Sequence, residues 1–261
     1  MFNLIYCNFE LYYFFLNIYK KKTMIFSIET STSNLSLTLL SNSKVFNKLS
    51  IKIKNELSEI IIPTIKKFMT DNSITFQSVS LLVVGCGPGS FTSIRALISA
   101  AKGIYLSNKH MKILGINSLA GLAMSALNEA KNINVEYILA SIDTKRNDQF
   151  LQLFKVNNCN KSLLPFSVIN NIEPIKIENF SLYLKKNKLV VGNFLYVGFI
   201  SSLLKNKSPN INFYKKSNQI PDAVWVGKLG LYITKNNINY KSSKIAFDEF
   251  KPIYVRYPEI N

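Results

Sequence analysis

Two acidic residues stand at the ends of apolar segments, where they could take part in phosphoryl-transfer chemistry. Glu29 closes the apolar segment 24–29, and Asp143 closes a second apolar segment further along the chain. A carboxylate in such a place can hold Mg²⁺ or act as a general base, while the turn after it binds phosphate. The turn Thr30–Ser33 has no glycine, although glycine would let backbone amides approach a phosphate closely. The pattern therefore predicts a cleft whose turns are poorly suited to bind phosphate. An autonomous sugar kinase-like enzyme or ATPase is one function that these residues leave open, as the alternative to a role without catalysis.

A glycine-rich segment lies between an apolar run and a helical pattern. Its residues with a proposed role are Gly85, Gly87, Pro88, Gly89, Ser90, Thr92 and Arg95. Glycine permits a tight turn, proline stiffens it, and Ser90 or Thr92 is suited to cap the helix that follows. Free amide groups at the start of a helix also attract anions. The segment is interpreted either as a structural strand-to-helix turn or as an anion-binding loop.

Histidine and cysteine chemistry has little material in this sequence. The chain has one histidine, His110, and three cysteines, Cys7, Cys86 and Cys159. The cysteines are too widely spaced for a CxxC metal pair or a disulfide framework, which fits a reducing compartment. The single histidine removes most zinc and Ser-His-Asp triad chemistry; that the chain has no metal site and no catalytic residue is implied by the resemblance described below.

The net formal charge of +17 is the most prominent compositional feature. Such a charge suits a polyanionic partner such as nucleic acid. However, only three of the 32 basic residues are arginine, namely Arg95, Arg146 and Arg256. The lysines are scattered, as in proteins from AT-rich genomes, so compositional drift is the second interpretation. With 48% apolar and 18% charged residues, the chain is expected to fold.

The part of the chain after Met24 shows alternating strand and helix patterns. Segment 24–29 reads as a buried strand, alternation over 35–39 as a second strand, and 45–53 as a third, giving an antiparallel meander. The continuous apolar run 81–84 predicts a strand that is buried on both faces. This alternation with helices favours an α/β fold.

Two helical patterns, 57–69 and 90–105, are apolar on more than one side. Pro63 lies inside the first pattern and predicts a kink or a late helix start. A helix in a two-layer lobe needs one buried stripe, so a second stripe indicates either a protein interface or packing within the chain. The residues assigned to the candidate partner interface are Leu57, Ile61, Ile62, Ile65, Met69, Ile94, Leu97, Ala96, Ala100 and Gly103.

The second half of the chain echoes the first. Ile142-Asp143 repeats Ile28-Glu29, and Val190-Val191-Gly192 repeats Val83-Val84-Gly85, which predicts two duplicated lobes. Asp222 is expected to cap a helix over 223–234. The proposed divisions are an N-terminal extension, 1–23, an N-terminal lobe, 24–116, a C-terminal lobe, 117–246, and a C-terminal tail, 247–261.

The extension 1–23 precedes the first clear strand. Its uncharged part, Leu11–Tyr19, is shorter than the roughly 20 residues of a membrane span. Its basic triplet, Lys20–Lys22, follows the apolar part, whereas a secretory signal has the opposite order. We interpret Met24 as the functional first residue and expect no membrane association; a membrane-surface anchor is the alternative.

Two lobes that each open with a meander, whose first strand ends in an acidic residue, resemble the actin-like ATPase and sugar-kinase superfamily. The predicted fold is therefore α/β, a two-lobed actin-like ATPase (ASKHA) fold with a duplicated mixed β-sheet plus helices. In that superfamily the turns after the acidic residues hold nucleotide phosphates and a divalent metal. The resemblance makes Glu29 and Asp143 the residues of a vestigial nucleotide cleft, although a shared fold does not establish chemistry.

The string GPGSFT, followed by Arg95 and by Ala101-Lys102-Gly103, resembles the TsaB (YeaZ) family. Further segments that resemble family motifs follow in order: Ser58-Glu59 with Pro63, Gly115–Ala123, Ile142–Arg146 and Pro252–Arg256. The chain departs from the family pattern at Glu29, where Asp is usual, at Leu57, where His is usual, and at Ser93 and Asn147, where Gly is usual. The last departure raises the question of whether the turn after Asp143 keeps its shape, because asparagine tolerates positive φ less well than glycine.

The resemblance implies a role in making threonylcarbamoyladenosine beside the tRNA anticodon. In that process TsaD holds the metal and transfers the threonylcarbamoyl group, TsaE is the ATPase, and TsaB is a non-catalytic scaffold that activates TsaD. The implied partners are TsaD, TsaE, a second copy of the chain when TsaD is absent, and tRNA through the complex. The implied location is cytoplasmic. No cofactor is expected, although weak nucleotide binding in the cleft stays open.

Overall fold

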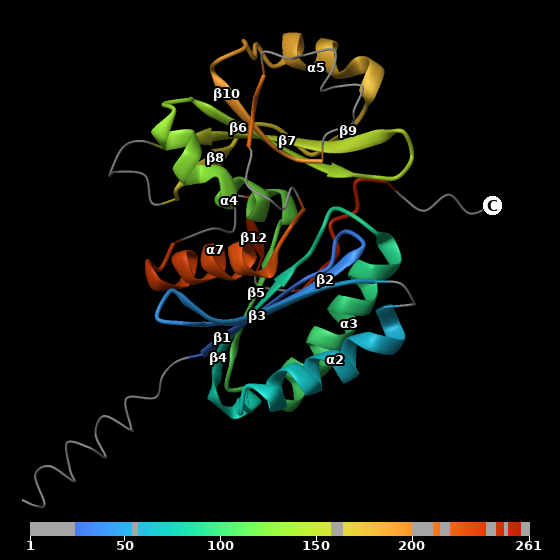
Figure 1. The fold of residues 1–261 in the computed structure, drawn as a ribbon, viewed down its shortest axis with the longest axis vertical. Helices are drawn as coiled ribbons and strands as arrows, with labels where there is room; N and C mark the ends of the chain where they lie inside the picture. Colours follow the sequence, from blue (N-terminus) through green and yellow to red (C-terminus); the bar gives the residue numbers. More distant parts are fainter. Residues whose placement is uncertain are drawn as a thin grey trace, which may run out of the picture.

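The computed structural model describes residues 24–53, 57–157, 164–199, 211–214, 220–238, 244–247 and 250–256. The predicted N-terminal extension 1–23 and the last residues of the predicted tail lie outside the described residues. Figure 1 shows two lobes, one above the other, each built on a β-sheet. The expected α/β fold with two mixed sheets plus helices is confirmed.

The first sheet has the strand order β12-β5-β4-β1-β2-β3. Its strands are β1 (Met24–Glu29), β2 (Asn34–Ser41), β3 (Lys44–Lys52), β4 (Val79–Gly85), β5 (Lys112–Ile116) and β12 (Ala246–Phe247). β1, β2 and β3 form the predicted antiparallel meander, while β4 and β5 add parallel strands on the other side of β1. β1 is buried along its whole length. Residues 81–84 of β4 are buried as well, as their continuous apolar run predicts.

Two helices, α2 (Leu57–Asp71) and α3 (Phe91–Ser107), cover one face of the first sheet (Figure 1). A short 3₁₀ turn, Phe76–Ser78, follows α2. α2 begins at Leu57 and contains Pro63, so the predicted late start is wrong. Pro63 lies near the end of the second turn of the helix, on its exposed side.

The second sheet repeats this plan with the order β11-β10-β6-β7-β8, and β9 also pairs with β7. Its strands are β6 (Tyr137–Asp143), β7 (Asp148–Val156), β8 (Phe166–Val168), β9 (Glu173–Lys176), β10 (Phe194–Gly198) and β11 (Asn212–Phe213). β6 pairs antiparallel with β7 and parallel with β10, just as β1 pairs with β2 and β4. The duplication is therefore present at the level of topology.

The repeat is not where the valines predicted it. Val190 and Val191 are exposed and lie before β10, not within a strand. The strand equivalent to β4 is β10, and it ends at Gly198. Gly198 follows Ile142 at nearly the same chain separation as Gly85 follows Ile28. The sequence match at Gly192 was thus a chance similarity close to the true repeat.

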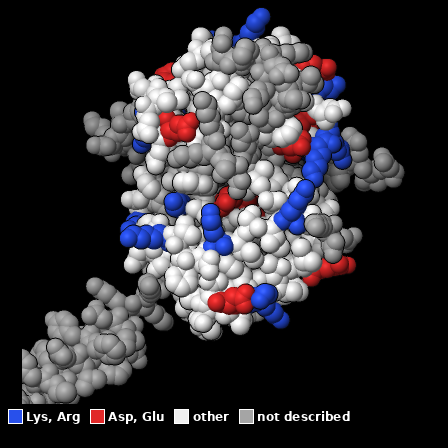
Figure 2. All heavy atoms as spheres, in the orientation of Figure 1, with Lys and Arg blue, Asp and Glu red and all other residues white. Residues whose placement is uncertain are grey.

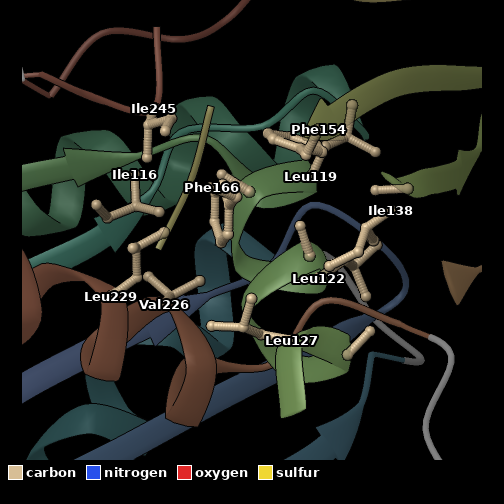
Figure 3. Packing of buried hydrophobic residues seen from close by; sticks show 14 of the residues in the cluster. Ile116, Leu119, Leu122, Leu127, Ile138, Phe154, Phe166, Val226, Leu229 and Ile245 are labelled. Carbon is tan, nitrogen blue, oxygen red and sulfur yellow. The ribbon is translucent and has the colours of Figure 1, made fainter. Parts of the chain in front are cut away.

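Two helices fill the space between the sheets. α4 (Ser118–Asn132) packs on β6 and β10, and α7 (Ala223–Lys235) packs on β1, β2 and β4. Figure 3 shows apolar residues of both helices meeting residues of both sheets in one cluster. Small residues allow close packing here, because a Cβ atom added to Gly121 would lie 2.9 Å from Val226. Asp222 caps α7 as predicted, with its carboxylate accepting the Val224 amide proton at 2.7 Å.

The remaining elements complete the layers. A 3₁₀ turn, Ile177–Asn179, and α5 (Phe180–Lys186) cover the outer face of the second sheet. β12 pairs with β5, so the chain returns to the first sheet at Ala246. This residue is the last one of the range 117–246 that was assigned to the C-terminal lobe from the sequence. The described tail, 250–256, is not a strand.

Candidate functional site

A cavity of about 770 Å³ lies between the two lobes. Its first-lobe wall consists of Ser31–Ser33 after β1 and of 88–94 at the start of α3, and its second-lobe wall includes 141–146 after β6. The tail residues 253–256 line it as well. The predicted cleft therefore exists, and the two turns after the acidic strands both reach it.

Asp143 lies in this cavity, as predicted. Its carboxylate accepts the backbone amide proton of Lys145 at 2.8 Å, which closes the turn after β6. Lys145 and Asn147 both have a left-handed backbone, with φ of 59° and 58°. Asparagine adopts this conformation more readily than most residues. The turn after Asp143 thus closes with asparagine, not glycine, at position 147.

Glu29 does not line the cavity. Its side chain is 1% exposed and accepts two hydrogen bonds, from the Ser31 amide at 2.6 Å and from the Ser118 hydroxyl at 2.8 Å. Burial raises the pKa of the Glu29 carboxyl above its ordinary value, against the lowering effect of these donors. Burial, and secondly the Glu29 carboxylate, raise the pKa of the nearby Cys86 thiol to about 12. Of the two predicted cleft carboxylates, only Asp143 is placed to meet a ligand.

The glycine-rich segment is held by the protein itself. The Gly87 amide donates to the Ser118 hydroxyl at 3.2 Å, and the Ser90 amide donates to the Ser31 carbonyl at 2.8 Å. Gly89 is required for this approach, because a Cβ atom there would lie 2.0 Å from the Ser31 carbonyl oxygen. The Ser90 hydroxyl accepts the Ser93 amide proton at 3.5 Å, so Ser90 is the helix cap. Because these amides already have partners, the structural interpretation of the segment is favoured over the anion-binding one.

The other members of that segment lie around the same loop. Gly85 ends β4, and a Cβ atom there would lie 1.8 Å from the Glu29 carboxylate. Pro88 lines the cavity and follows Gly87, whose φ is 90°. Thr92 also lines the cavity and is exposed, and Arg95 is exposed one turn further along α3.

A strap formed by residues 250–256, which sequence reasoning did not assign to the site, joins the two lobes. Phe250 is buried in the core of the first lobe, and the Ile253 amide donates to the Cys86 carbonyl at 2.8 Å. At the other end, Arg256 forms an ion pair with Asp148, which is 5% exposed and begins β7. An acidic residue at the start of an otherwise buried strand was the one signal in the sequence that such a partner exists.

The residues of the candidate partner interface on α2 and α3 differ in exposure, and most of them are buried. Six of its ten residues are buried in the core of their own lobe: Leu57, Ile61, Ile65, Met69, Ile94 and Leu97. Ala100 is 9% exposed and belongs to the same core. These seven residues therefore do not form an open surface. The three that reach the surface are Ile62, Ala96 and Gly103.

An outer face of α3 is nevertheless open. Ala96, Ser99, Gly103 and Leu106 are spaced by three and four residues, which places them on one side of the helix. Leu106 is 64% exposed, and a Cβ atom at Gly103 would have no described atom within 4 Å. We call these four residues the α3 outer face. Sequence reasoning found Ala96 and Gly103 but missed Leu106.

Among the described residues there is neither a cluster of metal-binding side chains nor a helix that could span a membrane. No three His, Cys, Asp or Glu side chains among them come close enough to hold a metal ion. The ring of His110 is exposed and lies 3.2 Å from the Phe76 carbonyl. None of the described helices is both long and apolar enough to cross a membrane.

Comparisons with known proteins agree on one process. Residues 51–162 match the family model described as TsaD, tRNA N6-adenosine threonylcarbamoyltransferase. The tRNA threonylcarbamoyladenosine biosynthesis protein TsaB of Buchnera aphidicola subsp. Schizaphis graminum (strain Sg) is 30% identical over 177 residues, which span 65% of this chain and 78% of the relative. The TsaB protein of subsp. Acyrthosiphon pisum (strain APS) is 27% identical over 227 residues, or 83% and 96% of the two chains.

One solved structure shows the same fold. YeaZ from Pseudomonas aeruginosa superposes with a TM-score of 0.62 over 89% of this chain and 100% of its own, at 14% sequence identity. The match covers both lobes, so the layered arrangement of the sheets and helices is shared with that protein.

Proposed function

The chain belongs to the TsaB family and takes part in the formation of threonylcarbamoyladenosine in tRNA, and we propose that it does so as a non-catalytic partner that activates TsaD. In this proposal TsaE joins the assembly, two copies of the chain pair when TsaD is absent, and tRNA is brought to the chain by the complex, in the cytoplasm. The chain needs no metal or cofactor of its own, and its cleft is at most a weak nucleotide site.

The α3 outer face carries the proposal. A large exposed leucine, Leu106, next to residues with little or no side chain gives a surface to which a second helix can come close. Helices that pack through small residues approach to about 8 Å. A helix of TsaD, or α3 of a second copy, is the proposed occupant.

The burial of Glu29 supports a non-catalytic role. A phosphoryl-transfer enzyme of this fold would need both carboxylates in the cleft, whereas Glu29 is held by Ser31 and Ser118 beneath its surface. The amides of Gly87 and Ser90, which would be candidates for phosphate contacts, are also occupied. These contacts leave Asp143 without a second acidic partner in the cavity.

Substituting Leu106→Glu tests the proposed interface. Binding to the TsaD of the same organism and threonylcarbamoyladenosine formation in substrate tRNA should fall together, because a carboxylate would be buried without a partner. Leu182→Glu on α5 is a matched control, since Leu182 is also 64% exposed and lies on the other lobe. Full binding of TsaD by Leu106→Glu would place the interface elsewhere.

A turnover assay tests the non-catalytic part separately. The purified chain should not hydrolyse ATP or phosphorylate sugars above background. Turnover that disappears in Asp143→Ala would show that the cleft is an active site and would contradict this part of the proposal.

A further inference from the structure

All three arginines of the chain lie around the mouth of one cavity. Arg146 and Arg256 line the cleft, and the Arg95 guanidinium lies 5.0 Å from the ring centre of Phe91, which lines it too. Every other basic residue among the 32 is lysine. Arginine presents a planar set of donors that suits phosphate and stacks on rings, which lysine cannot reproduce. A chain that uses lysine almost everywhere thus has its three arginines in or beside the walls of one cavity.

A tilted pair of aromatic rings, Phe91 and Tyr254, lies beside these arginines. The ring of Tyr254 lies 5.3 Å from the ring of Phe91, whose other neighbour is the Arg95 guanidinium. Tyr254 is 48% exposed, so part of its ring is available to a further planar group. Unpaired RNA bases stack on exposed aromatic rings and on guanidinium planes. The strap holds Tyr254 in this place through the Ile253 amide and the Arg256 ion pair.

The half-buried part of the cavity lining differs in character from the arginines, which are all exposed. Asp143 and the hydroxyl-bearing residues Thr32, Ser33 and Ser93 belong to it, and such groups pair with ribose hydroxyls and base edges. The volume of about 770 Å³ is within the range of sites that enclose a small organic group. A negatively charged phosphate is attracted by the guanidinium groups, of which that of Arg256 is shared with Asp148, and is repelled by Asp143. The arrangement is complementary to a nucleoside inside and phosphates across the mouth.

We propose that the mouth of this cleft is a direct RNA contact, which takes an unpaired nucleotide of the substrate tRNA with its flanking phosphates. The inference rests on the role of the chain in tRNA modification and adds a site to it. RNA fits better than a free nucleotide, because the cationic groups lie at the mouth of the cavity. A free nucleotide would need the amides of the glycine-rich loop for its phosphates, and these amides donate to Ser31 and Ser118 instead. Figure 2 shows basic side chains on both sides of the region between the lobes, which suits a long polyanion.

Binding of the full chain to a fluorescein-labelled, unmodified substrate tRNA transcript, measured by anisotropy over a range of salt, tests the proposal. The double variant Arg95→Ala/Arg146→Ala should bind the transcript at least about tenfold more weakly than the unmodified chain. Its slope of log affinity against log salt should fall by about 1.4, since each phosphate contact on a single strand contributes about 0.7. The matched control is Lys48→Ala/Lys52→Ala, which removes the same charge from exposed positions on β3. It should change affinity by less than about threefold.

Cross-linking locates the contact. Transcripts carrying 4-thiouridine should cross-link to the peptides that contain Phe91 and Tyr254; Tyr254→Phe should keep these cross-links and Tyr254→Leu should lose them. Equal losses of affinity in the arginine and lysine doubles, cross-links elsewhere only, or AMP or ATP binding as tightly as tRNA would each overturn the proposal. Thermal melts show that the variants are folded. Parallel binding to TsaD separates this site from the α3 outer face, since the arginine double should bind TsaD normally.

Discussion

Replacing Gly103 with alanine should make the isolated chain more stable and its complex with TsaD weaker. Gly103 lies within α3, and a Cβ atom at its position meets no described atom within 4 Å. In an exposed helix interior, alanine is more favourable than glycine by about 0.8–1 kcal/mol. For a domain of this size that difference raises the melting temperature by roughly 2–4 °C.

The same methyl group should hinder a partner helix. If the α3 outer face meets another helix at close range, an added methyl forces the two backbones apart, and overpacking of this kind costs about 1–3 kcal/mol. The dissociation constant should then rise by about 5- to 150-fold. The two effects have opposite signs, so a general loss of folding cannot imitate them.

Differential scanning calorimetry of the isolated chain and titration calorimetry against TsaD measure the two effects. Asn128→Ala is the matched control, because Asn128 is exposed on α4, remote from α3, and also gains helix propensity. It should raise the melting temperature and leave the affinity unchanged. If Gly103→Ala leaves affinity unchanged, the close helix contact is absent; if it lowers the melting temperature, this face is covered within the chain itself.

Three further outcomes are expected. The pKa of Glu29 is raised in the folded chain, so above pH 4.5 the folded state holds more protons than the unfolded state and the free energy of unfolding declines as the pH rises. Glu29→Gln should therefore reduce the loss of melting temperature between pH 5 and pH 8. Arg256→Ala leaves the buried Asp148 carboxylate without its ion pair and should cost about 1–3 kcal/mol in urea unfolding, part of which Asp148→Asn in the same chain should restore. At Asn147, where φ is 58°, valine should cost about 1–2 kcal/mol and glycine almost nothing, as judged by melting temperature.

Local patterns in the sequence were sufficient to predict most elements. The meander before Ile53, the strand that ends at Gly85 and the cap at Asp222 all follow from periodicity and capping preferences within about ten residues. The fold class followed from the repetition of this plan. The repeat was misplaced in the second lobe because Val190-Val191-Gly192 imitates a strand end, although its valines are exposed.

Contacts between distant residues could not be predicted in this way. The hydrogen bond from Ser118 to Glu29 joins residues 89 positions apart, and the ion pair between Arg256 and Asp148 joins residues 108 positions apart. No spacing rule predicts either pair. The same limit applies to α2 and α3, where periodicity shows that a helix has two apolar sides but does not show that both can be covered by the chain's own core.

The glycine-rich loop shows how one pattern can arise from two physical causes. In phosphate-binding loops, glycines after a strand let backbone amides approach a phosphate. Here Gly89 makes room for the Ser31 carbonyl, and Gly85 makes room for the Glu29 carboxylate, which lies where its Cβ atom would be. The loop thus uses its glycines to hold the turn after β1 and to bury the first acidic residue. In this loop the amides of Gly87 and Ser90 donate to Ser118 and Ser31, so they are not open to a phosphate. The RNA contact that we propose therefore relies on the exposed side chains at the cavity and not on the amides of this loop.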